Sequence, residues 1–209
     1  MRKPDLEDYR LYFVTDSTLH RGYSVLEQVE LALKGGVKII QIREKQMEFR
    51  DLITLSKQAL KLTREYGAFL IINDSVEVAL KTGADGVHLG EMDTSVRDAR
   101  LILSENRVIG FSVKTTEEAI KAESMGADYV AVNGVFPTQT KTDLGYLPGL
   151  EAVRLIRKSV SLPVIGIGGI NTGNFESVIE AGAHGVAVVT AITMSENIPE
   201  TCRLFLKSQ

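Results

Sequence analysis

Short apolar runs alternate with amphipathic stretches from one end of the chain to the other. The apolar runs are rich in Val and Ile, which is typical of parallel strands covered on both faces. The stretches between them repeat apolar residues at helical spacing, and several begin at a capping Ser and end at Gly. We expect strands at about 11–15, 38–43, 68–72, 86–89, 108–112, 129–132, 163–167 and 185–189, with helices at about 24–35, 49–66, 75–81, 96–103, 116–124, 150–158, 174–181 and from 199 onward.

A short phrase recurs where an expected helix gives way to a strand. It reads Gly83-Ala84-Asp85, Gly126-Ala127-Asp128 and Gly182-Ala183-His184, and each glycine can end the helix before it. Repetition without a Pro/Ser/Gly-rich linker predicts a single-domain (β/α)8 TIM barrel over about 10–209, after a polar N-terminal extension at 1–9. The main alternative is an open doubly wound sheet, whose usual first-turn Gly-x-Gly-x-x-Gly is missing here.

Composition narrows the class of protein. The 209 residues are 44% hydrophobic and 24% charged, enough for one sizeable core. A net charge of −3 argues against a nucleic-acid binder, and no run approaches the roughly 18 apolar residues of a membrane span. Cys202 is the single cysteine, expected to pack in the last helix, and it fits a reducing compartment. With a polar N-terminus lacking a signal-peptide core, these features predict a cytoplasmic protein.

Cationic side chains cluster after two of the expected strands. In a TIM barrel the residues after each strand meet at one face, where active sites lie. Gln41, Arg43 and Lys45 follow the second strand at alternate positions, and Lys141 follows the sixth. Three positive charges on one face of an acidic protein indicate an anion site, although solvated loops would also carry them. The stretch Val135–Lys141 is, read alone, more typical of a plain polar turn after a strand that Pro137 ends.

Two carboxylates follow the third and fourth strands. Asp74 and Asp93 suit a hard cation such as Mg²⁺, which is often held by one or two carboxylates and substrate phosphates. The alternative for Asp74 is that it caps the helix after it.

The last two strands carry a second candidate anion site. Gly168-Gly169 and Val189-Thr190 stand where barrels frequently bind phosphate through backbone amides, although Gly-Gly can also merely turn the chain. His88, inside the fourth strand, is expected to be a core histidine with its hydrogen bonds satisfied. No histidine cluster, Ser–His–Asp order or paired carboxylate acid and base is evident.

Five motifs in order carry a family resemblance. They read Gln41-Ile-Arg-Glu-Lys45, Ile72-Asn-Asp74, Gly83-Ala-Asp-Gly-Val-His-Leu-Gly90, Val135-Phe-Pro-Thr-Gln-Thr-Lys141 and Ile167-Gly-Gly-Ile170. From about residue 11 to 192 the sequence resembles the thiamine phosphate synthase family. The resemblance implies a compact (β/α)8 barrel and a transferase that joins a hydroxymethylpyrimidine pyrophosphate to a thiazole phosphate. The products are thiamine phosphate and pyrophosphate, formed by Mg²⁺-assisted dissociative loss of pyrophosphate.

The resemblance also implies a role for each motif residue. Mg²⁺ would be bound by Asp74 and Asp93, and the leaving group stabilised by Arg43, Lys45 and Lys141. Relatives suggest a homodimer. The pyrimidine pyrophosphate would be held by Gln41, Ile42, Arg43, Glu44, Lys45, Asn73, Ser112 and Lys141, and the thiazole phosphate by Thr138, Gln139, Thr140, Gly169, Val189 and Thr190.

Several positions depart from the family pattern. Glu91 stands where Gln is common, Lys114 where relatives often carry His, and Thr190 where Ser is usual. Asn133-Gly134 replaces a usual Gly-Pro, and the segment 142–148 is atypical. Two alternatives remain. A thiazole tautomerase on the same barrel usually lacks the intact Thr-x-Thr-Lys loop and relies on a histidine near the fifth strand. A non-catalytic phosphate-ligand sensor would have lost the carboxylates or the cations.

Overall fold

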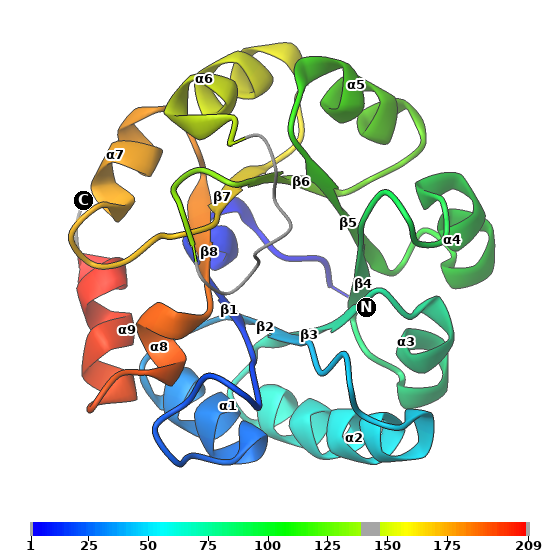
Figure 1. Cartoon of the computed structure of the whole chain (residues 1–209). Helices are drawn as coiled ribbons and strands as arrows, with labels where there is room; N and C mark the ends of the chain where they lie inside the picture. Colours follow the sequence, from blue (N-terminus) through cyan, green and yellow to red (C-terminus); the bar gives the residue numbers. More distant parts are fainter. Residues whose placement is uncertain (1, 139–146, 208–209) are drawn as a thin grey trace.

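The chain forms a closed barrel of parallel strands surrounded by helices (Figure 1). The computed structural model describes residues 2–138 and 147–207. Strand β1 pairs with both β2 and β8, which closes the barrel and confirms the predicted (β/α)8 fold. The strands are β1 (Leu11–Val14), β2 (Ile39–Ile42), β3 (Phe69–Asn73), β4 (Gly86–Leu89), β5 (Val108–Val113), β6 (Tyr129–Asn133), β7 (Val164–Ile167) and β8 (Gly185–Val188).

Helices cover the outside of the barrel. Ser24 caps the first of them, as predicted, by accepting a hydrogen bond from the Glu27 amide. No helix in the described ranges is long and apolar enough to cross a membrane. The helices are α1 (Val25–Lys34), α2 (Phe49–Glu65), α3 (Val76–Thr82), α4 (Val96–Leu103), α5 (Thr116–Ser124), α6 (Gly149–Ser159), α7 (Phe175–Glu180), α8 (Thr190–Thr193) and α9 (Ile198–Lys207).

Alternate residues of each strand face opposite sides, and this separates two apolar layers. On β1, Tyr12 belongs to the cluster inside the barrel, whereas Leu11 packs between the strands and the helices. On β2, Ile42 packs in that outer layer, while Gln41 reaches Tyr12 in the barrel interior. Cys202 is buried in the outer layer, so its predicted packing role is confirmed.

The recurring Gly-Ala-Asp phrase has a structural role that the sequence did not reveal. Its third residue uses a side-chain acceptor to bind a backbone amide near the start of the preceding strand. A histidine replaces the aspartates once, and a ring nitrogen then does the same work. The Leu70 amide donates to Asp85 Oδ2 at 2.8 Å, the Ile109 amide to Asp128 Oδ2 at 2.7 Å and the Val164 amide to His184 Nδ1 at 3.0 Å.

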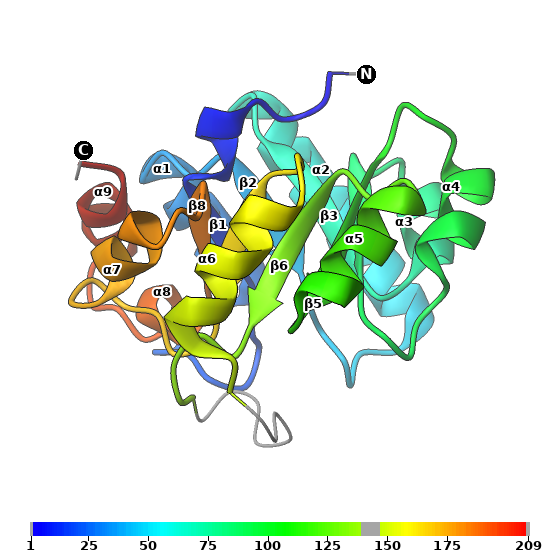
Figure 2. The same ribbon diagram turned by 90° about the horizontal axis from the view of Figure 1, so that it is seen from above.

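The segment before β1 packs across the end of the barrel where the strands begin (Figure 2). It contains the short 3-10 helix η1 (Leu6–Tyr9), and Lys3 Nζ lies 2.6 Å from Asp128 Oδ1. The Tyr9 side chain is buried, with its ring centroid 5.3 Å from that of Tyr129. This segment therefore closes the end of the barrel away from the strand-end face.

The sixth strand ends at Asn133, one residue beyond the expected range of 129–132, and Pro137 is not the residue that ends it. Pro137 was expected to end it, but β6 stops at Asn133 because Gly134 adopts a left-handed conformation with φ of 85°. The chain then stays beside the end of β7. The amides of Gly134 and Phe136 donate to the carbonyls of Ile167 at 2.9 Å and Gly168 at 3.0 Å.

Candidate functional site

A cavity of about 560 Å³ opens where the strands end, and all eight strands contribute to its lining. A second hollow of about 570 Å³ adjoins it beside α8 and shares Thr138, Gly169 and Thr190 with it. Strand-end loops of a TIM barrel are where active sites lie. The predicted site residues that line the main cavity are Gln41, Arg43, Lys45, Asn73, Asp74, Asp93, Ser112, Thr138, Gly169, Val189 and Thr190.

Two of the remaining predicted residues, Ile42 and Glu44, do not line this cavity. Gln139, Thr140 and Lys141 lie outside the described residues. Ile42 is buried between strands and helices, because its neighbour Gln41 takes the inward position.

Glu44, another predicted binding residue, is almost fully buried and turned to the loop after β1. It accepts hydrogen bonds from Thr15 Oγ1 at 2.8 Å and from the Ser17 amide at 3.2 Å. Thr15 Oγ1 in turn accepts from the Arg43 amide at 3.1 Å. Glu44 thus fixes the backbone that carries Arg43, instead of pointing into the cavity.

Cations line the cavity on two sides. Arg43 and Lys45 come from the loop after β2, and Lys45 Nζ lies 3.5 Å from Asp74 Oδ2. Lys114 and Lys121, from the end of β5 and from α5, also line it. Helical periodicity alone does not reveal that Lys121 of α5 reaches the cavity wall. The cavity therefore suits an anionic ligand.

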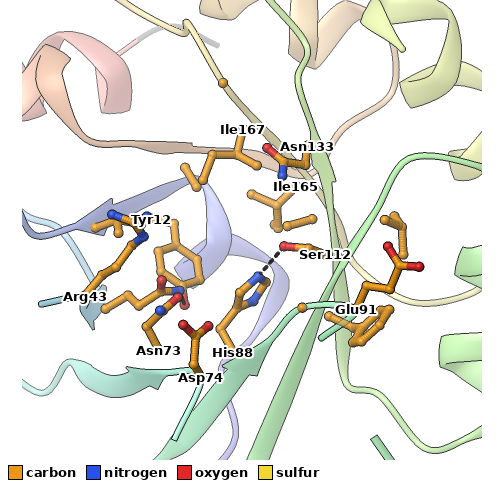
Figure 3. Close-up of a pocket in the computed structure, with 18 of the residues that line it drawn as sticks. Tyr12, Arg43, Asn73, Asp74, His88, Glu91, Ser112, Asn133, Ile165 and Ile167 are labelled. Carbon is orange, nitrogen blue, oxygen red and sulfur yellow. Dashed lines mark hydrogen bonds between the residues drawn. The ribbon is translucent and has the colours of Figure 1, made fainter. Parts of the chain in front are cut away.

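The two predicted metal-binding aspartates both line the cavity and interact with each other. Figure 3 shows the first of them, Asp74, beside Asn73. Asp74 has φ of 62°, an uncommon conformation for a residue with a Cβ. The helix after it is capped by Ser75, whose hydroxyl accepts from the Val78 amide at 3.2 Å. The alternative that Asp74 caps the helix is therefore wrong, and its carboxylate serves the cavity.

The carboxylate of the second aspartate, Asp93, interacts with that of Asp74. Partial burial and the neighbouring Asp74 carboxylate raise the pKa of Asp93, although its hydrogen bond from the Gly90 amide acts the other way. A bound divalent cation would relieve this repulsion. The described residues contain no group of three or more His, Cys, Asp or Glu able to hold a metal. Glu91 does not join the pair, since it lies on the other side of His88 from Asp74 (Figure 3).

The opposite side of the cavity is built from backbone. Gly169 has φ of 61°, and a Cβ there would overlap the Pro137 carbonyl and lie 2.9 Å from Phe136 Cβ. Glycine is therefore needed for the loops after β6 and β7 to touch. Beside them, α8 begins at Thr190. A short extra helix at this place is common in phosphate-binding barrels, because its first amides have no partner within the helix.

A buried polar chain lies below the cavity, and sequence reasoning missed most of it. Tyr12 and Tyr129 were assigned to strands only, although an inward-facing tyrosine needs a partner for its hydroxyl. Burial raises the pKa of both hydroxyls, so they stay protonated. His88 is hydrogen-bonded at both ring nitrogens, to Tyr129 and to Ser112, as expected of a core histidine, yet it also lines the cavity.

A closed (β/α)8 barrel with cations, paired carboxylates and a glycine-built loop at one cavity defines a barrel protein for phosphorylated ligands. The sequence model of thiamine monophosphate synthase matches residues 11–192. The chain belongs to this family.

Individual relatives cover nearly the whole chain. Thiamine-phosphate synthase of Clostridium novyi is 41% identical over 91% of this chain and 94% of its own length. That of Syntrophomonas wolfei is 42% identical over 94% of each. Among solved structures, thiamine phosphate pyrophosphorylase from Pyrococcus furiosus matches with a TM-score of 0.88 and 38% identity, covering 97% of this chain and 96% of that one.

Proposed function

We propose that the protein is a thiamine-phosphate synthase, a transferase that releases pyrophosphate. The observation that supports the proposal is that one cavity has two unlike sides, each with groups suited to an anion. Arg43, Lys45 and the aspartate pair lie on one side, and the backbone around Gly169 and Thr190 lies on the other. One substrate of this reaction is a pyrophosphate and the other a monophosphate, so the site must hold two phosphate groups apart.

The leaving-group side would hold the hydroxymethylpyrimidine pyrophosphate. Arg43 and Lys45, with Lys141 outside the described residues, would neutralise the pyrophosphate as its bond to the methylene carbon breaks. Asp74 and Asp93 would hold Mg²⁺ together with pyrophosphate oxygens, and bound Mg²⁺ supplies further positive charge for the leaving group. The carboxylate pair with its raised Asp93 pKa supports this assignment.

The reaction then needs position more than acid or base. The carbon–oxygen bond breaks with its electron pair going to pyrophosphate, and the lone pair of the thiazole nitrogen forms the new carbon–nitrogen bond. No proton moves, which agrees with a cavity in which we assign no general base. Gln41, Asn73 and Ser112 would orient the pyrimidine so that the nitrogen can reach the carbon.

The thiazole phosphate would occupy the other side. Gly169, Val189, Thr190 and Thr138 line this part of the cavity, where their backbone amides and hydroxyls could reach a phosphate. Backbone amides at the start of a helix suit a phosphate dianion. Gln139 and Thr140 would extend the site, and they lie outside the described residues.

The test mixes the protein with both substrates and Mg²⁺ and follows thiamine phosphate by chromatography. We expect product that disappears when EDTA is added and returns with Mg²⁺. Tautomerisation of the thiazole without coupling would instead indicate the thiazole tautomerase, and binding of both ligands without turnover would indicate a sensor. The cavity lining favours the synthase, since Lys114 stands at the end of β5 where the tautomerase relies on histidine. A homodimer and a cytoplasmic location stay predictions, and light scattering measures the first.

A further inference from the structure

Five side chains form one continuous hydrogen-bonded chain across the inside of the barrel. The chain runs from β2 to β5, and both of its ends, Gln41 and Ser112, line the cavity. Its members are at most 8% exposed, apart from Ser112 at the cavity wall. The links are Gln41 Nε2 to Tyr12 Oη at 2.8 Å, Tyr12 Oη to Tyr129 Oη at 2.8 Å, Tyr129 Oη to His88 Nδ1 at 2.9 Å and His88 Nε2 to Ser112 Oγ at 2.9 Å.

The first link sets the direction of every other link. The Gln41 NH₂ group can only donate, so the Tyr12 oxygen accepts. The buried Tyr12 hydroxyl needs an acceptor for its own hydrogen, and its other partner, Tyr129, supplies one. Tyr129 accepts this hydrogen and donates its own to His88 Nδ1. A neutral imidazole that accepts at Nδ1 carries its proton at Nε2 and donates it to Ser112.

We propose that this chain fixes the hydrogen-bonding polarity of the pyrimidine side of the cavity, with an acceptor at Gln41 Oε1 and a donor at the Ser112 hydroxyl. Tyr12, Tyr129 and His88 are the positioning residues that hold this polarity. The proposal rests on the proposed function, because it is the aminopyrimidine pyrophosphate that offers both an amino donor and acceptor atoms.

Electrostatics favour this direction over its reverse. If Gln41 turned its oxygen toward Tyr12, every proton in the chain would reverse, and Ser112 would donate to His88. Ser112 would then offer only lone pairs to the cavity, and a nearby pyrophosphate oxygen would be repelled. Since anionic ligands need donors, the direction that Gln41 Nε2 sets is the one that suits a pyrophosphate.

The same direction excludes one chemical role for the Ser112–His88 pair. A serine nucleophile needs a base that can take its proton. Here His88 Nε2 already donates to Ser112 Oγ, and its Nδ1 faces a tyrosine. The pair therefore orients a donor and does not generate a nucleophile.

Packing keeps the central tyrosine in place. The ring centroid of Tyr129 lies 5.3 Å from that of Tyr9, 5.8 Å from Tyr12 and 5.5 Å from His88. A Cβ on Gly110 would overlap the Tyr129 ring, so glycine on β5 makes room for it. Because these contacts involve the ring, Tyr129→Phe should remove the central link while keeping the packing.

The direct test uses ¹⁵N NMR of the histidine rings in the ligand-free protein at pH 7. The protein has three histidines, and the His88 signals are assigned by their loss in His88→Gln. We expect a neutral His88 with its proton at Nε2. A proton at Nδ1, or at both nitrogens, would overturn the proposal. This result does not depend on turnover, so it separates failure of the polarity from failure of the proposed function.

Kinetics give the second test, with Tyr9→Phe as the matched control. The Tyr9 ring packs against the Tyr129 ring, but the Tyr9 hydroxyl is not a member of the hydrogen-bonded chain. Tyr129→Phe should raise the KM for the pyrimidine pyrophosphate or lower kcat, so that kcat/KM falls about tenfold, the effect of losing one buried link. The KM for the thiazole phosphate should not change, and His88 should show mixed tautomers. If Tyr129→Phe and Tyr9→Phe have the same kinetics and the same His88 tautomer, the positioning role is refuted.

Discussion

Gly169→Ala tests how the loops after β6 and β7 build the phosphate side of the cavity. Gly169 has φ of 61°, and an added Cβ would overlap the Pro137 carbonyl. The left-handed conformation costs a residue with a Cβ about 1–2 kcal/mol. Overpacking against backbone adds about 1–3 kcal/mol, so the expected loss of stability is about 2–5 kcal/mol.

Gly67→Ala is the matched control for this substitution. Gly67 has φ of 60°, almost the same conformation, but nothing lies within 4 Å of an added Cβ. It should therefore show the conformational cost alone, about 1–2 kcal/mol, which lowers the melting temperature by about 2–4 °C for each kcal/mol. The difference between the two variants isolates the contact with the loop after β6.

Steady-state kinetics report what that contact does for the site. Relief of the overlap should move the backbone of Phe136 and Pro137, which leads into Thr138, because Gly169 lies against it. We expect Gly169→Ala to raise the KM for the thiazole phosphate about tenfold to a hundredfold, with a much smaller change for the pyrimidine pyrophosphate. Gly67→Ala should change neither. Equal kinetic effects in the two variants, or a change confined to the pyrimidine substrate, would refute the reasoning.

Three further substitutions test other parts of the site and fold. Glu44→Ala leaves the Thr15 hydroxyl without its acceptor and loosens the Arg43 backbone, so the KM for the pyrimidine pyrophosphate should rise about tenfold; an unchanged KM would contradict the positioning role. Asp93→Asn should raise the Mg²⁺ concentration for half-maximal activity at least about tenfold, and an unaltered Mg²⁺ dependence would remove Asp93 from the metal site. Burial and Arg157 lower the pKa of His184, so its strand-capping contribution is complete above its ordinary pKa and is lost as pH falls through the lowered value. His184→Asp, which restores the repeated Gly-Ala-Asp phrase, should abolish this loss of stability when melting temperatures are compared across acidic pH. If the loss persists in the variant, another group causes it.

The sequence was sufficient for the architecture because the periodic signals are strong. Val108–Val113 and Tyr129–Asn133 differ from the expected strands by one residue at one end, and α4 and α5 match the expected ranges. The short helix α8 was missed, since four residues are too few for a helical period to appear. Pro137 was expected to end β6, but the chain already turns at the positive φ of Gly134, before the proline is reached.

For the site, strand-end placement found the residues whose direction follows from strand alternation. Gln41, Arg43 and Lys45 were predicted to project together, and all three line the cavity. Glu44 was assigned by motif alone, and its direction depends on Thr15, a partner from the loop after β1. The hydrogen-bonded chain from Gln41 to Ser112 was not predicted, because it depends on partners from other strands. Its links join residues up to 117 positions apart, and no local pattern contains them.

The proposed function is tested most directly by ³¹P NMR of one mixture containing the protein, Mg²⁺, hydroxymethylpyrimidine pyrophosphate and thiazole phosphate. We predict that pyrophosphate and thiamine phosphate appear in equal amounts, and that neither forms when the thiazole phosphate is omitted or Lys45 is replaced by Ala. Both substrates remaining unchanged, or pyrophosphate released without thiamine phosphate, would contradict the account.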